Sequence, residues 1–341
     1  GSIIVGGLRY NDDNAVVARE DVPEWRLGMT VAVTGDVDSS FENGIAQKLK
    51  SVVQMRGVVD VVDTTPSSPH CRLLGSKVSV DDETVWADLS GLAGLSGGTR
   101  VQVWALPVAS GELRATRVET EGITATTTLV TGMISALNDV NKTFQLGNLV
   151  VGYASATSTE GLAVDRIVRV EASTPPSGGR LQATKVEGWY ALTTVQGAPV
   201  QLEGVIDEFV SRGNFKLMGV AIDASAAQVT GGQPDKLDDN VKVVASGMLL
   251  SNGVLSASKV KIRHIPGEGA LARYYDVHGT IENYQSPTDM RVRSVSGGVQ
   301  KVDVGAAVVS GTGQLQNGQK VRVQGSQVVN GVLKVTQLTY E

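Results

Sequence analysis

The 341-residue sequence is poor in the residue types that mark disulfide-linked or membrane-spanning architectures. Cys71 is its only cysteine, which excludes an internal disulfide bond. No apolar run approaches the ~20 residues that a membrane-spanning helix needs, so the sequence predicts no membrane span. Aromatic residues make up only 4% of the chain. This scarcity argues against carbohydrate and single-stranded nucleic-acid sites, because both usually stack on exposed rings.

An excess of charge of one sign is also missing. The chain carries 30 Lys and Arg residues and 35 Asp and Glu residues, for a net charge of −5, without a basic patch or an acidic block. Nucleic-acid binding depends on clustered Lys and Arg that neutralise phosphates. The sequence therefore predicts no nucleic-acid partner.

The sequence contains no recognisable catalytic set. Its three histidines, His70, His264 and His278, fall at different phases of the repeat described below, so they do not predict a nucleophile–base–acid site. The chain has no Gly-x-Ser-x-Gly elbow, phosphate-binding loop or His-Glu-x-x-His motif. These absences predict a protein that is not an enzyme and uses no cofactor.

Candidate metal ligands are few. His70 and Cys71 are adjacent, and adjacent residues of an extended strand point to opposite faces. The pairs Asp12-Asp13 and Asp81-Asp82 occupy matching repeat positions and raise the hypothesis of calcium ligands. They lack the alternating acidic run and terminal Glu of a calcium-binding loop. We therefore interpret them as turn residues at strand ends, and the sequence predicts no metal site.

What the sequence has in abundance is the chemistry of strands and turns. It contains 40 glycines, and apolar and polar residues alternate along many segments, as in Val321-Arg322-Val323 and Leu333-Lys334-Val335. Alternation gives a strand one dry and one wet face. Asn330-Gly331 lies between these two segments and is typical of a two-residue hairpin turn. The pattern predicts an all-β protein.

Three sequence anchors repeat with a period of roughly 70 residues, which indicates tandem units. A Gly followed by an apolar strand begins at Gly57, Gly132, Gly204 and Gly279. A Val-x-Val pattern begins at Val31, Val101, Val168, Val241 and Val321. A closing pattern, apolar-x-apolar-x-x-apolar, begins at Leu113, Leu181, Leu255 and Leu333. The last pattern shifts the inward-facing parity by one residue, which predicts a β-bulge at the same place in each unit.

The repeat predicts a tandem array of about five small, five-stranded, OB-like β-barrels, with an open, partly rolled sheet as the alternative. The predicted units are an incomplete unit 1 at residues 1–52, unit 2 at 53–125, unit 3 at 126–196, unit 4 at 197–270 and unit 5 at 271–341. Aromatic pairs occur in two of the connectors, Trp189-Tyr190 and Tyr274-Tyr275. We expect them to pack one unit on the next; a ligand-stacking platform is the alternative.

Unit 1 is predicted to lack its opening strand. Residues 75–85 align without gaps on residues 6–16, but only five residues precede Gly6, whereas a whole strand precedes Gly75. The segment Ile3, Ile4 and Val5 would then form an open sheet edge with unpaired backbone groups. Residues upstream of Gly1 could supply the missing strand, or a neighbouring subunit could lay a strand into the edge and join units head to tail, with a filament as one outcome.

Several motifs resemble those of a known family. Residues 1–10 (GSIIVGGLRY) and 27–35 (LGMTVAVTG), with endings at 113–119 and 181–187 of the form Leu-x-Ala-x-x-Val-Glu, resemble a bacterial domain of unknown function that occurs in tandem copies. Gly6 departs from the family pattern, which has Asn there. The resemblance implies an exported protein, since the family occurs in exported proteins and predicted lipoproteins of Gram-negative bacteria. It implies no activity and no functional residues.

These observations lead to a functional hypothesis. We expect a non-enzymatic, exported structural or interaction protein of the cell surface, extracellular space or periplasm, whose partners are further copies of itself or other surface proteins. The alternative is a binding module that holds a small ligand or oligosaccharide on one barrel face. Such a module would show one polar-lined cleft that its sibling units lack.

Overall fold

The computed structural model describes residues 1–19, 24–121, 127–189, 197–268 and 272–341, and within these ranges the chain is all-β with two short 3-10 turns. The all-β prediction is confirmed. Within the same ranges, no helix is long and apolar enough to cross a membrane. The boundaries predicted near residues 125, 196 and 270 lie outside the described residues.

The strands follow the repeat. Unit 1 contains β1 (Ser2–Val5), β2 (Leu8–Asn11), β3 (Val16–Arg19), β4 (Ala32–Val37) and β5 (Asn43–Ser51). Unit 2 contains β6 (Met55–Asp63), β7 (His70–Leu73), β8 (Ser76–Ser79), β9 (Val85–Trp86), η1 (Leu92–Gly94), β10 (Arg100–Ala109) and β11 (Glu112–Thr120). Unit 3 contains β12 (Thr128–Met133), β13 (Ser135–Asn138), β14 (Thr143–Leu146), β15 (Leu149–Gly152), β16 (Ile167–Ala172), β17 (Arg180–Gln182) and β18 (Lys185–Gly188). Unit 4 contains β19 (Pro199–Ser211), β20 (Asn214–Leu217), β21 (Val220–Asp223), β22 (Gln228–Thr230), η2 (Pro234–Lys236), β23 (Lys242–Leu249) and β24 (Leu255–His264). Unit 5 contains β25 (Tyr274–Ser286), β26 (Asp289–Ser294), β27 (Val299–Asp303), β28 (Val308–Ser310), β29 (Lys320–Val329) and β30 (Val332–Tyr340).

One winding recurs in units 2, 4 and 5. In unit 2 the opening strand β6 pairs antiparallel with both β7 and β10, β7 turns into β8, and β10 turns into β11. The closing strand β11 then runs parallel to β8 and β9. The turn between β7 and β8 uses Leu74 and Gly75, whose φ angles of 52° and 76° give the twist that a tight hairpin requires.

The predicted bulges are confirmed in units 2, 4 and 5, and their chemistry repeats; in unit 3 the closing segment is instead divided into β17 and β18. The register between the last two strands slips at Thr116, Ser258 and Thr336, the residue after each anchor's second apolar position. Each of these hydroxyls donates to a backbone carbonyl of the facing strand, over 3.1, 3.3 and 3.2 Å. A small hydroxyl residue therefore satisfies an acceptor in the region where the bulge disturbs the ladder.

The prediction of separate, closed, OB-like barrels in a row is wrong. Backbone pairing continues from unit to unit: β12 pairs with β6, β25 pairs with β9, and one sheet of 15 strands runs through units 2, 3 and 5. The architecture is a solenoid-like stack of β coils that share sheets. The physical reason is that exposed strand edges carry unpaired N–H and C=O groups, which a neighbouring coil can satisfy.

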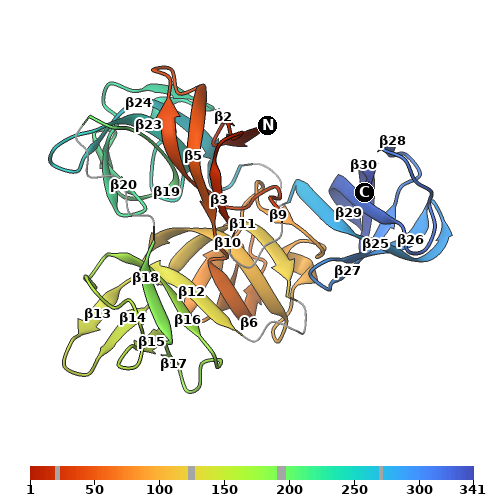
Figure 1. Ribbon diagram of the computed structural model, residues 1–341, viewed down its shortest axis with the longest axis horizontal. Coiled ribbons are helices and arrows are strands. Elements are labelled where there is room, and N and C mark those ends of the chain that lie inside the picture. The colour runs from red at the N-terminus through yellow and green to blue at the C-terminus, as the bar shows by residue number, and fades with distance from the viewer. Residues whose placement is uncertain (20–23, 122–126, 190–196, 269–271) are drawn as a thin grey trace.

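Unit 2 lies at the centre of the molecule (Figure 1). Unit 1 lies beside unit 4 at the top, unit 3 extends to the lower left, and unit 5 projects to the right. The largest apolar core runs through units 2, 3 and 5, a second core is centred on unit 4, and unit 1 has a small core of its own.

Candidate functional site: an unfilled strand position in unit 1

Unit 1 has the strand order of unit 2 without its opening strand. Strand β1 pairs with β2, β2 and β3 run parallel to β5, and β4 pairs antiparallel with β5. These pairings are those of β7 to β11 in unit 2. Among residues 1–19 and 24–52, no strand corresponds to β6.

The hairpin fixes this correspondence to the residue. Val5 pairs with Leu8 around a turn at Gly6 and Gly7, just as Leu73 pairs with Ser76 around the turn described above. The gap-free alignment predicted from the sequence is therefore shifted by one residue at the hairpin. The shift arises because turn residues with positive φ set the register, whereas glycines alone do not.

Between β1 and β4 lies a position that no strand fills. In unit 2, β6 occupies this position and pairs on both of its sides. In the part of unit 1 that the structure describes, β1 pairs only with β2, and β4 only with β5. The outer edges of both strands consequently have no ladder partner among the described residues, and such edges are templates for an added strand.

Side-chain burial shows the consequence for the core. The two valines of the Val-x-Val anchor are at most 2% exposed in units 2 to 5. The buried pairs are Val101 and Val103, Val168 and Val170, Val241 and Val243, and Val321 and Val323. In unit 1 the same anchor residues, Val31 and Val33, are only half-buried. The inward-facing wall of unit 1 is thus left partly open where β6 covers its counterpart.

The predicted edge residues lie along this opening. Ile3 and Val5 are half-buried and pack against the core of unit 1, whereas their counterparts Cys71 and Leu73 are 4% and 0% exposed. Ile4 points to the other face and is 59% exposed. All three belong to β1, and whether a partner strand binds there remains a prediction.

Neighbouring units hold unit 1 in place. Gln201 of unit 4 donates through Nε2 to the Val5 carbonyl over 3.0 Å, and the Lys259 ammonium donates to the Ser40 carbonyl. Arg117 of unit 2 donates to the Leu27 carbonyl over 2.8 Å. Gly28 packs so closely that a Cβ atom there would lie 2.8 Å from Val85. Contacts with units 2 and 4 therefore hold the unit that contains the open position.

Comparison with known proteins identifies the repeat. The sequence profile of a family described as "Domain of unknown function (DUF5666)" matches residues 56–119, 131–187 and 203–261, just over half of the chain. The chain belongs to this family. The matched segments are units 2, 3 and 4; unit 5 has the strand order of units 2 and 4, and the described part of unit 1 has it without the opening strand.

Other comparisons add little. No curated protein matches the chain. A solved structure titled "drosophila Unr CSD456" is 16% identical, over 63% of this chain and 98% of that chain, with a TM-score of 0.16. A TM-score this low carries no argument about fold or function.

Buried ion pairs join the DUF5666 units. Asp81 of unit 2 accepts from Arg114 over 3.1 Å and from Lys242 of unit 4 over 3.3 Å, and all three side chains are at most 7% exposed. Burial raises the pKa of Asp81, but the charges of Lys242 and Arg114 outweigh it and hold that pKa below its usual value. Removing one partner of such a cluster leaves an uncompensated buried charge. The junction of units 2 and 4 is therefore built as a fixed contact.

The described residues of the two aromatic pairs, Trp189, Tyr274 and Tyr275, lie at junctions between units. Trp189 is 6% exposed and belongs to the apolar core centred on unit 4; Tyr190 lies outside the described residues. Tyr274 and Tyr275 pair in parallel with Val85 and Trp86 of unit 2. Tyr275 is buried, and Tyr274 is 39% exposed with the Arg273 guanidinium 5.5 Å from its ring centroid.

The candidate catalytic and metal-binding residues lie apart. The ring nitrogen of His70 contacts the Ser68 carbonyl, His264 contacts Asp82, and His278 contacts Glu341. Burial raises the pKa of the Cys71 thiol to about 12. Asp12 and Asp13 lie near the N-terminal amine, unlike their buried counterparts in unit 2. Among the described residues, no group of three or more His, Cys, Asp or Glu side chains could hold a metal ion.

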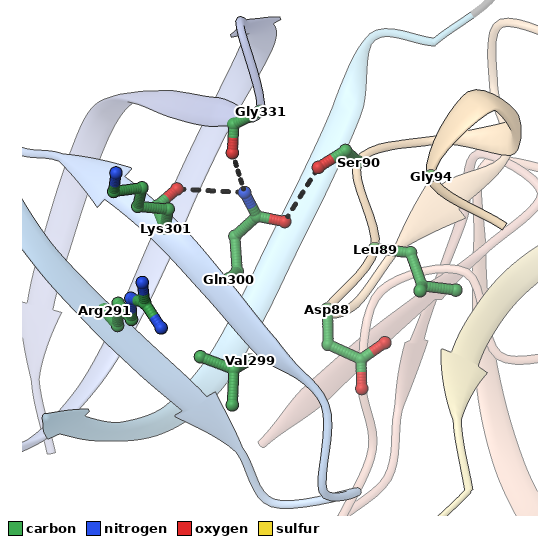
Figure 2. Close-up of a pocket in the computed structure, with 9 residues that line it drawn as sticks. All are labelled: Asp88, Leu89, Ser90, Gly94, Arg291, Val299, Gln300, Lys301 and Gly331. Carbon is green, nitrogen blue, oxygen red and sulfur yellow. Dashed lines mark hydrogen bonds between the residues drawn. The ribbon is translucent and has the colours of Figure 1, made fainter.

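Sequence reasoning missed one polar site, between units 2 and 5. A cavity of about 260 Å³ lies there, lined by Asp88, Ser90, Arg291 and Gln300 among others (Figure 2). The Gln300 amide accepts from Ser90 and donates to the Lys301 and Gly331 carbonyls. The Asp88 carboxylate accepts from Thr120 of its own unit and from Ser296 of unit 5. The Ser90–Gln300 and Ser296–Asp88 contacts bridge the two units, and they depend on a docking that no local motif signals.

Proposed function

We propose that the protein is a non-enzymatic, exported structural or interaction protein in which unit 1 receives a β-strand from a partner chain. The observation that carries the proposal is the unfilled position between β1 and β4, with Val31 and Val33 half-buried beside it. A strand added there would pair on both sides and cover the open wall of the core. The partner is a further copy of the protein or another surface protein.

The geometry of the complete units specifies the incoming strand. Opening strands β6, β19 and β25 all run antiparallel to both of their neighbours, so the added strand would run antiparallel to β1 and β4. Completing the burial of four half-buried apolar side chains contributes on the order of 1 kcal/mol each, before the new ladder hydrogen bonds are counted.

Two further observations support the rest of the proposal. The histidines each contact a different acid or carbonyl, and none of the hydrogen bonds found in the described ranges joins them to a hydroxyl nucleophile. Export is supported by the resemblance of the sequence motifs to a family of exported proteins. The location is therefore the cell surface, the periplasm or the extracellular space.

The test supplies the missing strand within the same chain. Gly1 and Pro69 accept equivalent hydrogen bonds, from Asp12 and Val80, so residues 55–69 can be fused directly before Ser2 to copy the connection found in unit 2. Light scattering and electron microscopy should show that the unfused chain self-associates or binds a partner strand. The fusion should abolish this association and raise the melting temperature.

A matched control carries the same fusion, with Val59→Asp in the added copy of residues 55–69 only. This change places a charge on the core-facing side of the added strand. This control should leave association intact. Equal association of the chain with and without the functional fusion would overturn the proposal. A natural polypeptide whose upstream residues already close unit 1 would overturn it too.

A further inference from the structure

A short strand lies on the same side of the closing strand in four of the five units. These strands are β3, β9, β22 and β28, and each runs parallel to the last strand of its own unit. Val85 and Trp86 of β9 correspond to Val308 and Val309 of β28, because Val118 and Leu338, their partners, occupy the same place in the closing anchor. The outer edge of this short strand can be compared from unit to unit.

In unit 2 this edge is occupied. The start of β25 pairs with β9 in parallel, Tyr274 with Val85 and Tyr275 with Trp86. The two β9 residues are only 3% and 1% exposed. The β9 edge thus binds another strand of the same chain. The bound segment is extended and carries two aromatic rings.

In unit 5 the equivalent edge has no partner strand among the described residues. Strand β28 pairs only with β30 among the described residues, and Val308 and Val309 are 70% and 50% exposed. It lies on the outer part of unit 5, which projects away from the rest of the molecule (Figure 1). Adjacent exposed β-branched residues on a strand edge favour pairing with another chain.

The residue types differ between units in the way a docking site predicts. Unit 4 has Gln228 where units 2 and 5 have valine, and unit 3 has Thr157, so both present a polar residue at a place where no strand docks in the described residues. Unit 1 has exposed valines, Val16 and Val17, but residues 20–23 just beyond β3 lie outside the described range. Among the described edges, β28 therefore resembles the β9 edge in residue type and has no strand docked on it.

We infer that the β28 edge docks an extended, aromatic-bearing strand of another chain, in parallel register, as β9 docks Tyr274 and Tyr275 within this one. The inference extends the proposed function: it gives the molecule a second strand-accepting site, on unit 5 rather than unit 1. A chain with two such sites can join partners on two sides.

The test uses a fluorescein-labelled peptide with the sequence of residues 272–280 and the full chain. Fluorescence anisotropy should show saturable binding, and hydrogen exchange should show new protection at residues 308–310. The double variant Val308→Gln, Val309→Gln should weaken binding at least tenfold. The control Val140→Gln, at an exposed valine on a turn, should leave it unchanged. A peptide with both tyrosines replaced by serine should bind at least tenfold more weakly.

One further variant separates the two sites. Val33→Asp should impair strand binding in unit 1 but leave the peptide bound at β28. If Val33→Asp removes peptide binding and the β28 variant does not, the peptide binds in unit 1, which overturns the β28 inference and supports the proposed function. Absence of binding to the unmodified chain, or no new protection at residues 308–310, overturns the inference as well.

Discussion

Units 1 and 2 share a strand order and differ by one strand, and that strand determines how deeply their equivalent residues are buried. Val103 is 1% exposed in unit 2, whereas Val33, at the same place in the anchor, is half-buried in unit 1. Leu73 is fully buried, whereas Val5 is not. The compared residues are apolar in both units. Burial of a β core therefore depends on whether the coil is complete, and an incomplete coil presents an apolar wall and two strand edges to a partner.

The two units also differ in how their acidic turn residues are used. Asp81 is buried among Arg114 and Lys242, while Asp12, which closes an equivalent turn, lies near the N-terminal amine. Unit 2 contacts all of its neighbours, so its turns become junctions, whereas those of unit 1 remain near the surface.

Replacing Asp81 by alanine should cost about 3–5 kcal/mol of unfolding free energy, because Lys242 and Arg114 would lose a buried counter-charge. The matched variant Asp12→Ala should change stability by less than about 0.5 kcal/mol. Chemical denaturation of both variants measures the difference. Similar costs for the two would show that the position in the turn, rather than the junction, determines stability.

The contact of unit 2 with unit 5 should be sensitive to pH. Burial raises the pKa of Asp88 from 3.8 to about 6, so the native state binds more protons than the unfolded chain between these values. Stability should therefore fall as pH rises from about 4 to about 6, by up to about 3 kcal/mol from this group. Denaturation across this range should show that the wild type loses stability relative to Asp88→Asn as the pH rises, since the other carboxyl groups titrate in both proteins. Parallel curves for the two proteins would contradict it.

Val103→Ala should destabilise the protein by about 2 kcal/mol, since a fully buried side chain is shortened. Val33→Ala should cost less than half as much. In the fusion that adds residues 55–69 before Ser2, the cost of Val33→Ala should rise towards that of Val103→Ala. An unchanged cost in the fusion would mean that the added strand does not cover the core of unit 1.

Thr116→Val should cost about 1 kcal/mol, because the hydroxyl that donates to the Trp104 carbonyl at the bulge is lost. The register of unit 1 skips Gln47 at the corresponding place, and Gln47→Ala should have little effect on stability. Thermal denaturation compares the two. A neutral Thr116→Val would show that the repeated hydroxyl contributes nothing measurable at the bulge.

Much of this organisation can be predicted from the sequence. Alternating residues and turn glycines predict strands, the anchors predict the period, and the two-then-three spacing after Leu113, Leu255 and Leu333 predicts the bulges. The repeat also predicts the order of β1 to β5, which correspond to β7 to β11 of unit 2. These features depend on residues near one another in the chain, where steric and hydrogen-bonding preferences act directly.

Only the tertiary structure decided how the coils join. The pairing of β25 with β9, the contact of Lys242 with Asp81 across 161 positions, and the bridge from Asp88 to Ser296 across 208 have no local signal. The predicted row of separate barrels failed for the same reason. A strand edge has a similar sequence whether solvent, its own unit or a neighbouring coil completes it, and its partner is set by which unpaired backbone groups meet in space.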